Sequence, residues 1–338
     1  MKLTKILPRL VLTLLVLLGL DSSSFAQKII ATVPVGNSPL GIAVNRFTNR
    51  IYVANETSEP PQPPNTVSVI DGKTNQVTGH ITTGLDFQIG LGIDEFRQRI
   101  YVATLDSGVE VLDGKTNTAV ANIAVANEPV EVAVNPFTKR VYVSTQREGV
   151  AIIDELHNTI LDTIPLVDGS EPEGIAVNPI RNRVYAVGEA DHSSPWEIDG
   201  DTDTATRISV PQLNMSGSVA VNAVTDRIYL PNCCQLDSVL AIDQQNNQVV
   251  ATIPLGNLGP GDIAVDELRN LVYTCNGNPS GVSVVDGKLN RLLTTVLFAN
   301  PNAFCAGIAV NPLTNRIYAT NPGTDTVTVI SGPARRRD

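Results

Sequence analysis

The sequence contains few of the side chains on which familiar catalytic and cofactor sites depend. Its 338 residues include only three histidines, four cysteines, two methionines and one tryptophan. We expect no two of His80, His157 and His192 to meet, and no Cys-x-x-Cys-His motif, phosphate-binding glycine loop or nucleophile elbow occurs. These absences argue against a haem, a zinc or copper centre and a Ser/His/Asp triad. We therefore expect no catalytic residues.

Positive charge is also scarce. The formal net charge is -10, and it becomes -12 without residues 1–26, because that segment carries Lys2, Lys5, Arg9 and Asp21. A chain this acidic has little with which to neutralise phosphates, so no nucleic-acid partner is expected.

The conspicuous apolar run, residues 10–20, lies near the N-terminus. It follows three basic residues and precedes Ser24-Phe25-Ala26, which is the layout of a secretory signal peptide cleaved after Ala26. The run is short for a membrane span, so no transmembrane segment is expected in the mature chain, and a retained N-terminal anchor is the alternative. We predict a signal peptide over 1–26, a single domain over 27–331, a disordered basic tail over 332–338, and a periplasmic or secreted location.

A repeat organises the remaining chain. Its clearest copy is Gly307-Ile308-Ala309-Val310-Asn311-Pro312-Leu313-Thr314-Asn315-Arg316-Ile317-Tyr318. It occurs seven times and contains all the tyrosines of the chain, at positions 52, 101, 142, 185, 229, 273 and 318. A period in the low forties indicates an array of similar structural units.

Each repeat predicts four short antiparallel strands, which we name a to d in chain order. β-branched residues fill the strands, and Asn/Asp turns, often followed by proline, separate a from b. Seven such units indicate an all-β fold, a seven-bladed β-propeller. Residues 28–37 match 248–257 closely, so we predict that the N-terminal strand supplies strand d of the last blade and closes the ring.

Tyr52-Val53-Ala54-Asn55 and its counterparts resemble the YVTN β-propeller repeat family. The resemblance covers residues 28–331. It implies the propeller fold and export from a bacterial or archaeal cell, but no particular activity, because most members of the family have none established.

The two faces of such a ring are expected to differ. The a-to-b and c-to-d turns meet on one face, which we call the turn face. There, arginines that begin strand b lie near aspartates that end strand c, for example Arg50 near Asp71, and we predict that they pair within each blade. The d-to-a and b-to-c loops meet on the other face, the loop face, where propellers usually carry function. Insertions at 55–65 and 188–195 lengthen two of its loops.

Polar residues at the start of strand a are the candidate ligand-binding residues. They are Gln88, Glu131, Glu173 and Asp262. By position they rim the central channel, where Glu131, Glu173 and Asp262 can hold Ca²⁺ or a cationic ligand. They are equally compatible with solvated loop charges in an acidic protein. Lactonase-type propellers, which use a channel-bound metal, are the enzymatic analogue.

All four cysteines map to the loop face of three neighbouring blades. They are Cys233, Cys234, Cys275 and Cys305. In an oxidising compartment four cysteines suggest two disulfides. We predict one bridge between Cys275 and Cys305, because a d-to-a loop crosses near the end of the neighbouring strand b. A bond between Cys233 and Cys234, free thiols or another pairing stay open.

The sequence therefore favours an exported binding or scaffold module. Its partner is expected to be an envelope or extracellular protein, a small ligand or a glycan, bound at the loop face and channel mouth by a monomer. A metal-assisted, lactonase-like hydrolase or lyase at the channel is the alternative, and a purely structural envelope component is a third possibility.

Overall fold

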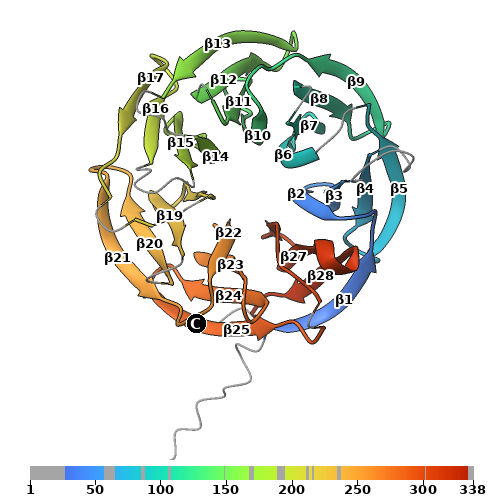
Figure 1. The fold of residues 1–338 in the computed structure, drawn as a ribbon, viewed down its shortest axis with the longest axis vertical. Coiled ribbons are helices and arrows are strands. Elements are labelled where there is room, and N and C mark those ends of the chain that lie inside the picture. The colour runs from blue at the N-terminus through green and yellow to red at the C-terminus, as the bar shows by residue number, and fades with distance from the viewer. Residues whose placement is uncertain are drawn as a thin grey trace, which may run out of the picture. The chain divides into compact units, whose positions relative to one another are not determined.

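The computed structural model describes residues 27–56, 65–84, 88–105, 108–147, 149–166, 171–188, 195–210, 213–214, 217–233, 237–300 and 302–333. Within them, seven sheets of four antiparallel strands stand in a ring (Figure 1). Residues 27–332 form one compact unit. The predicted all-β, seven-bladed propeller is confirmed.

The blades follow chain order, and each strand occupies the same place in every blade. The innermost strands a are β2 (Pro39–Asn45), β6 (Gln88–Asp94), β10 (Pro129–Asn135), β14 (Pro172–Asn178), β18 (Ala220–Asn222), β22 (Pro260–Asp266) and β26 (Ile308–Asn311). Strands b are β3 (Arg50–Asn55), β7 (Arg99–Thr104), β11 (Arg140–Thr145), β15 (Arg183–Gly188), β19 (Arg227–Asn232), β23 (Leu271–Asn276) and β27 (Arg316–Asn321).

Strands c are β4 (Thr66–Asp71), β8 (Gly108–Asp113), β12 (Gly149–Asp154), β16 (Trp196–Asp199), β20 (Ser238–Asp243), β24 (Gly281–Asp286) and β28 (Thr326–Ser331). The outermost strands d are β5 (Gln76–Thr82), β9 (Thr118–Ile123), β13 (Thr159–Pro165), β17 (Thr204–Arg207), β21 (Gln248–Pro254), β25 (Arg291–Leu297) and β1 (Lys28–Pro34). A short 3-10 helix, η2 (Pro322–Thr324), precedes β28. No helix in the described ranges is long and apolar enough to cross a membrane.

The two ends of the ring are joined as predicted. β1 pairs antiparallel with β28, from Lys28 opposite Ser331 to Pro34 opposite Thr326. The last blade therefore takes its outer strand from the start of the chain (Figure 1). This pairing satisfies the backbone groups of an edge that would otherwise stay open.

The apolar core lies between the blades. Each hydrophobic cluster draws side chains from two neighbouring blades, for example Tyr101 and Val109 from the second with Val141 and Ala151 from the third. All seven tyrosines are at most 1% exposed. A blade of four strands cannot bury both of its apolar faces alone, so each blade depends on its neighbours for stability.

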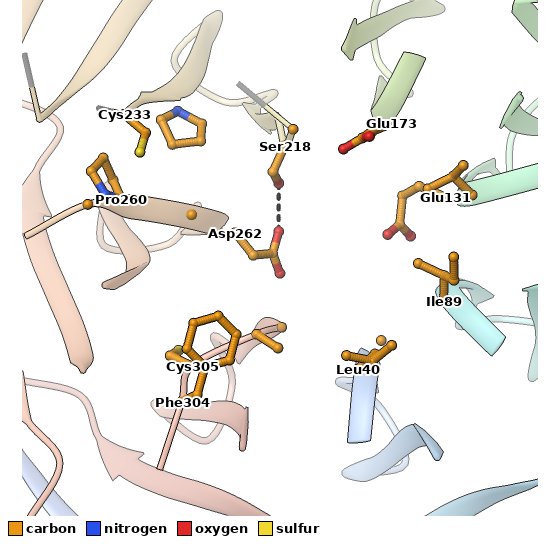
Figure 2. Close-up of a pocket in the computed structure, with 18 residues that line it drawn as sticks. Leu40, Ile89, Glu131, Glu173, Ser218, Cys233, Pro260, Asp262, Phe304 and Cys305 are labelled. Carbon is orange, nitrogen blue, oxygen red and sulfur yellow. Dashed lines mark hydrogen bonds between the residues drawn. The ribbon is translucent and has the colours of Figure 1, made fainter. Parts of the chain in front are cut away.

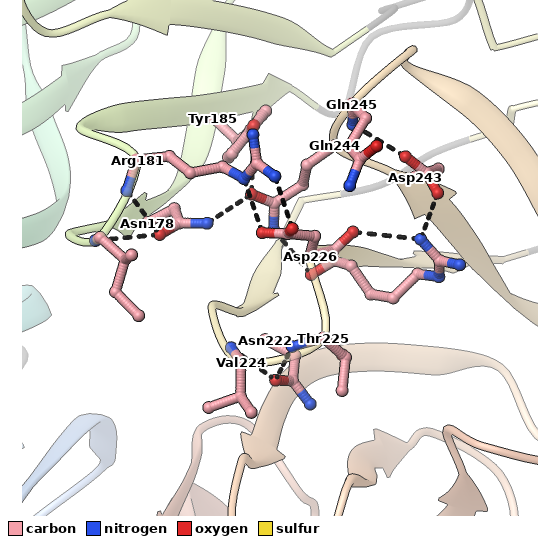
Figure 3. Close-up of polar contacts among 12 residues, drawn as sticks. Asn178, Arg181, Tyr185, Asn222, Val224, Thr225, Asp226, Asp243, Gln244 and Gln245 are labelled. Carbon is pink, nitrogen blue, oxygen red and sulfur yellow. Dashed lines mark hydrogen bonds and ion pairs between the residues drawn. The ribbon is translucent and has the colours of Figure 1, made fainter.

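The asparagine that ends strand a connects adjacent blades on the turn face. Asn178 is fully buried, and its Oδ1 accepts hydrogen bonds from the backbone N–H groups of Ile180 and Arg181, which fixes the a-to-b turn. Its Nδ2 donates to Gln244 Oε1 in the next blade (Figure 3). Asn45, Asn135, Asn222 and Asn311 likewise hold their own turn and reach the following blade.

Two blades carry aspartate at this position, and there a different residue makes the polar contact to the next blade. A carboxylate cannot donate a hydrogen bond, so Asp94 and Asp266 instead accept one from an arginine three residues later. Arg97 continues to Glu155 in the third blade, and Arg269 donates to the carbonyl of Pro312 in the seventh. The inter-blade contact is therefore retained although the residue that makes it changes.

The prediction that arginine and aspartate pair within each blade is only partly right. Arg99, Arg183 and Arg227 do contact the aspartates that end strand c of their own blades, at positions 113, 199 and 243. Arg50 and Arg140, however, donate to the carbonyls of Gly114 and Gly200 in the following blade. The guanidinium is long enough to cross the narrow gap between blades, so it ties two blades together there.

Candidate functional site

A cavity of about 450 Å³ opens at the loop-face mouth of the channel. Its walls are apolar for much of their area, and four polar side chains face one another across it (Figure 2). The apolar lining residues include Leu40, Ile89, Val130, Pro231, Pro260 and Phe304, and the polar ones are Glu131, Glu173, Ser218 and Asp262. An apolar wall with a few polar groups is typical of a small-molecule site.

One register position of strand a determines which side chains project into the channel. It lies four residues before the Asn or Asp that ends the strand, and its occupants are Gly41, Gly90, Glu131, Gly174, Ser218, Asp262 and Gly307. A Cβ atom at Gly307 would lie 2.3 Å from the carbonyl oxygen of Leu40 in the neighbouring blade. Glycine is needed there because the strands approach closely, so Glu131, Ser218 and Asp262 are the three places where the ring admits a side chain.

Asp262 is held in place by three blades. Its Oδ1 accepts hydrogen bonds from Ser218 Oγ at 2.6 Å and from the backbone N–H of Ile263 at 2.9 Å. Its Oδ2 accepts one from the N–H of Ile308 at 2.8 Å. These donors belong to blades five, six and seven, so the carboxylate is oriented before any ligand arrives.

Glu131 lies across the channel from Asp262 (Figure 2). Its Oε1 accepts a hydrogen bond from the N–H of Val132 at 3.1 Å. A second cavity of about 180 Å³ shares Gly41, Glu131, Gly217, Ser218 and Asp262 with the first. The two carboxyl groups therefore line both cavities and lie where a ligand in the channel would meet them.

The channel changes the protonation of both groups. Burial, and then the charge of Asp262, raises the pKa of Glu131 from 4.5 to about 8. Burial also raises the pKa of Asp262, while the hydrogen bonds from Ser218, Ile308 and Ile263 oppose that rise. Asp262 is thus equipped to be the carboxylate of the pair, and Glu131 to carry a proton near neutral pH.

The other predicted ligand residues lie differently. Glu173 is one position earlier in its strand than Glu131 and Asp262, and it lines the outer cavity but not the second one. Gln88 begins β6, where its backbone is opposite Thr104, but its side chain lies outside the described part of the protein. Sequence reasoning missed Ser218. Aligning the seven strands on their closing Asn or Asp would have found it.

Within the described residues, no group of three or more His, Cys, Asp or Glu side chains is arranged to hold a metal ion. His80 contacts Ser68 and His157 contacts Asp154, and His192 lies outside the described ranges. Most of the two long loops, residues 57–64 and 189–194, also lies outside the described ranges.

A disulfide borders the cavity. Cys275 at the end of β23 is bonded to Cys305, as predicted, and Cys305 lines the cavity beside Phe304 (Figure 2). Cys233, which also lines the cavity, is disulfide-bonded as well, and Cys234 lies outside the described residues. The bond between Cys275 and Cys305 ties the d-to-a loop of the seventh blade to the sixth.

The fold and this site define a seven-bladed propeller with a pocket at the mouth of its channel. No protein-family model matches the chain. It is similar to the uncharacterized protein YncE of Salmonella typhi and of Salmonella typhimurium, at 27% identity over 119 residues. That match spans 32% of this chain and about a third, 33%, of each relative.

The fold also resembles that of a solved structure. The Kuenenia stuttgartiensis hydrazine synthase aligns with a TM-score of 0.76 and 16% identity, over 88% of this chain and 97% of that one. At this identity the likeness shows the fold alone. Together with the match to YncE, it supports a YncE-like propeller.

Proposed function

We propose that this chain is an exported binding module that takes a small polar ligand into the mouth of its channel. The observation that carries the proposal is the opposed pair Glu131 and Asp262, placed in a 450 Å³ cavity at a position where four of the seven blades hold glycine. Export is supported by the disulfide between Cys275 and Cys305, because such bonds persist in oxidising compartments.

The protonation states suggest which ligands suit the site. At neutral pH Glu131 carries a proton and can donate a hydrogen bond, while an ionised Asp262 accepts them. A neutral ligand with hydroxyl groups, such as a sugar, satisfies both. A cationic amine prefers both groups ionised, so it should bind better as the pH rises through about 8.

Calorimetric titration with monosaccharides and with small primary amines at pH 6.5 and pH 9 tests the proposal. We expect one class of probe to bind to the wild type, and Glu131→Gln with Asp262→Asn to weaken its binding at least about tenfold. Glu171→Gln, an exposed position outside the cavity, is the matched control. If Glu131→Gln with Asp262→Asn binds the probe as tightly as the wild type does, the ligand lies elsewhere and the proposal is refuted.

A metal-assisted hydrolase or lyase of the lactonase type is the second candidate. It is supported by the three carboxylates that line one cavity and by the pKa of Glu131, which suits proton transfer near neutral pH. Calcium on Glu131, Glu173 and Asp262 would require these side chains to move closer together. Elemental analysis and calcium titration of the wild type and of a Glu131→Gln, Glu173→Gln double variant decide this. Stoichiometric metal lost in the variant would favour the enzyme.

A further inference from the structure

The turn face carries a ring of exposed apolar side chains. Each a-to-b turn places one large apolar residue at its tip, two positions after the Asn or Asp that ends strand a. The seven residues, which we call the apolar tip ring, are Phe47, Phe96, Phe137, Ile180, Val224, Leu268 and Leu313. They are 52 to 67% exposed, more than most apolar side chains outside this face.

The turn geometry explains why these side chains point outward. In the fifth blade, Asn222 Oδ1 accepts hydrogen bonds from the N–H groups of Val224 and Thr225, so the backbone at the tip turns in toward the asparagine. Val224 lies apart from the neighbouring polar network of Arg181, Asp226 and Gln244 (Figure 3). Turn tips normally carry polar residues, so apolar side chains on all seven blades call for an explanation beyond the fold.

Four of the arginines beside the ring are paired with carboxylates of the chain. Arg46 is paired with Glu95, Arg97 with Asp94, Arg181 with Asp226 and Arg269 with Asp266. Arg46 also lies over the Phe47 ring, 5.2 Å from its centroid. These four arginines are therefore not free to meet the headgroups of anionic lipid, although the lysines of this face, such as Lys139, are exposed.

A second copy of this chain fits such a surface. Although the chain is strongly acidic overall, these four ion pairs lower the repulsion that would oppose contact between two copies at this face. A large side chain that is half exposed offers roughly 100 Å², so two tip rings packed together cover roughly 1,400 Å². Specific interfaces cover about 1,200–2,000 Å² in total.

The outer rim of the same face is compatible with self-association. At equivalent c-to-d turn positions, Lys73, Lys115 and Lys288 stand in blades one, two and six, whereas Asp201 stands in blade four. Asp201 has 71% of its side chain exposed. A two-fold axis in the plane of the interface reverses the order of the blades, so this acidic turn can lie over a lysine-bearing turn of the other copy.

We propose that the apolar tip ring is a self-association surface through which two copies of this chain pack turn face to turn face. This differs from the monomer expected from the sequence. In such a dimer the two channel mouths lie on opposite outer ends, both accessible to ligand. The ring would also explain why apolar tips occur in all seven blades, since a face-to-face contact uses every blade.

Sedimentation equilibrium of the chain from residue 27 to its C-terminus, from about 1 to about 200 µM, tests this proposal over the range of a moderate dimer. We expect a reversible dimer for the wild type. Replacing three tips by serine (Phe137→Ser, Ile180→Ser, Leu268→Ser) should raise its dissociation constant at least about 100-fold. The matched control replaces three exposed apolar residues of the outer strands, Val120, Leu161 and Val250, by serine and should leave dimerisation unchanged.

A wild type that is monomeric throughout the range, or a dimer that the three tip substitutions leave intact, would refute the proposal. Co-sedimentation with vesicles of phosphatidylcholine or phosphatidylglycerol is the companion measurement. A monomer that binds vesicles through the tips would identify a lipid surface as the occupant instead. Circular dichroism of both triple variants verifies that they are folded.

Discussion

The two faces of the ring are built by opposite rules. On the turn face every blade repeats the same construction, in which Asn or Asp holds the turn and a polar contact reaches the next blade. On the loop face, the blades depart from one another: the same register position holds Gly41 in one blade and Glu131 or Asp262 in others. Repetition therefore identifies what stabilises the ring, and the departures mark the pocket in which we propose that a ligand binds.

The strongest test of this comparison is the replacement of a glycine that faces the channel. Gly307→Ala should lower the free energy of unfolding by about 3 kcal/mol, because the new methyl group would collide with the backbone of the first blade. Ser218→Ala, at the equivalent position of the fifth blade, should cost only about 1 kcal/mol through its lost hydrogen bond. Urea unfolding measures both. Equal losses would mean that the close approach of the strands does not select glycine.

The disulfide between Cys275 and Cys305 also occurs in only part of the loop face, and we expect it to stabilise the fold rather than bind a ligand. Replacing Cys275 and Cys305 by serine should lower the free energy of unfolding by about 3 kcal/mol, because the bond closes a loop between residues 30 apart. Unfolding of the oxidised proteins in guanidinium chloride measures the loss. If the double variant were as stable as the wild type, the bond would have no role in holding the loop face.

A buried amide and an exposed ion pair on the turn face should contribute unequally. Asn178→Ala should cost about 2 kcal/mol, since it removes the turn contacts and leaves Gln244 Oε1 with only the long contact from the Tyr185 hydroxyl, at 3.5 Å. Arg181→Ala should cost much less, because its ion pair with Asp226 is exposed to water.

Asn178→Asp provides a sharper version of the same test. Arg181 lies three residues later, as Arg97 does after Asp94, so the aspartate should be tolerated better than alanine. Thermal unfolding of the three variants ranks them. An aspartate variant less stable than the alanine variant would contradict the idea that the two inter-blade solutions are interchangeable.

The pH dependence of stability is the last expected effect, and it arises in the channel. The pKa of Glu131 is higher in the folded protein, about 8, than its ordinary value of 4.5, so folding favours the protonated form. Stability contributed by this group is present at low pH and is lost as the pH rises toward 8. We expect Glu131→Gln to flatten the decline by about 1–2 kcal/mol, since water in the channel screens part of the effect.

Urea midpoints at pH 5, 7 and 9 measure that decline, with Glu171→Gln as the matched control at an exposed position. Asp262 shifts in the same direction and stays in both variants, so a residual slope is expected. A wild type whose stability does not fall between pH 5 and pH 9 would show that the two carboxyl groups are better solvated than their positions suggest.

The sequence predicted several features of the loop face. The bond between Cys275 and Cys305 followed from which loop passes which strand end, and Glu131 and Asp262 do line one cavity. Ser218 was missed because serine has no chemical signature of its own. Glu173 was grouped with Glu131 and Asp262 although it stands one residue earlier, and in a strand one residue changes the direction of the side chain.

The number of blades, the order of the strands and the closure by residues 28–34 were determined by the sequence alone, because a repeat records the local period of its own structure. The tertiary structure decided how the blades contact one another. Arg50 and Arg140 bridge to the next blade, Arg97 takes over the inter-blade contact that Asp94 cannot make, and seven apolar tips come together on one face. The polar contacts named here join residues 58 to 64 positions apart, and their partners depend on the angle and spacing at which neighbouring blades pack, which no single repeat encodes.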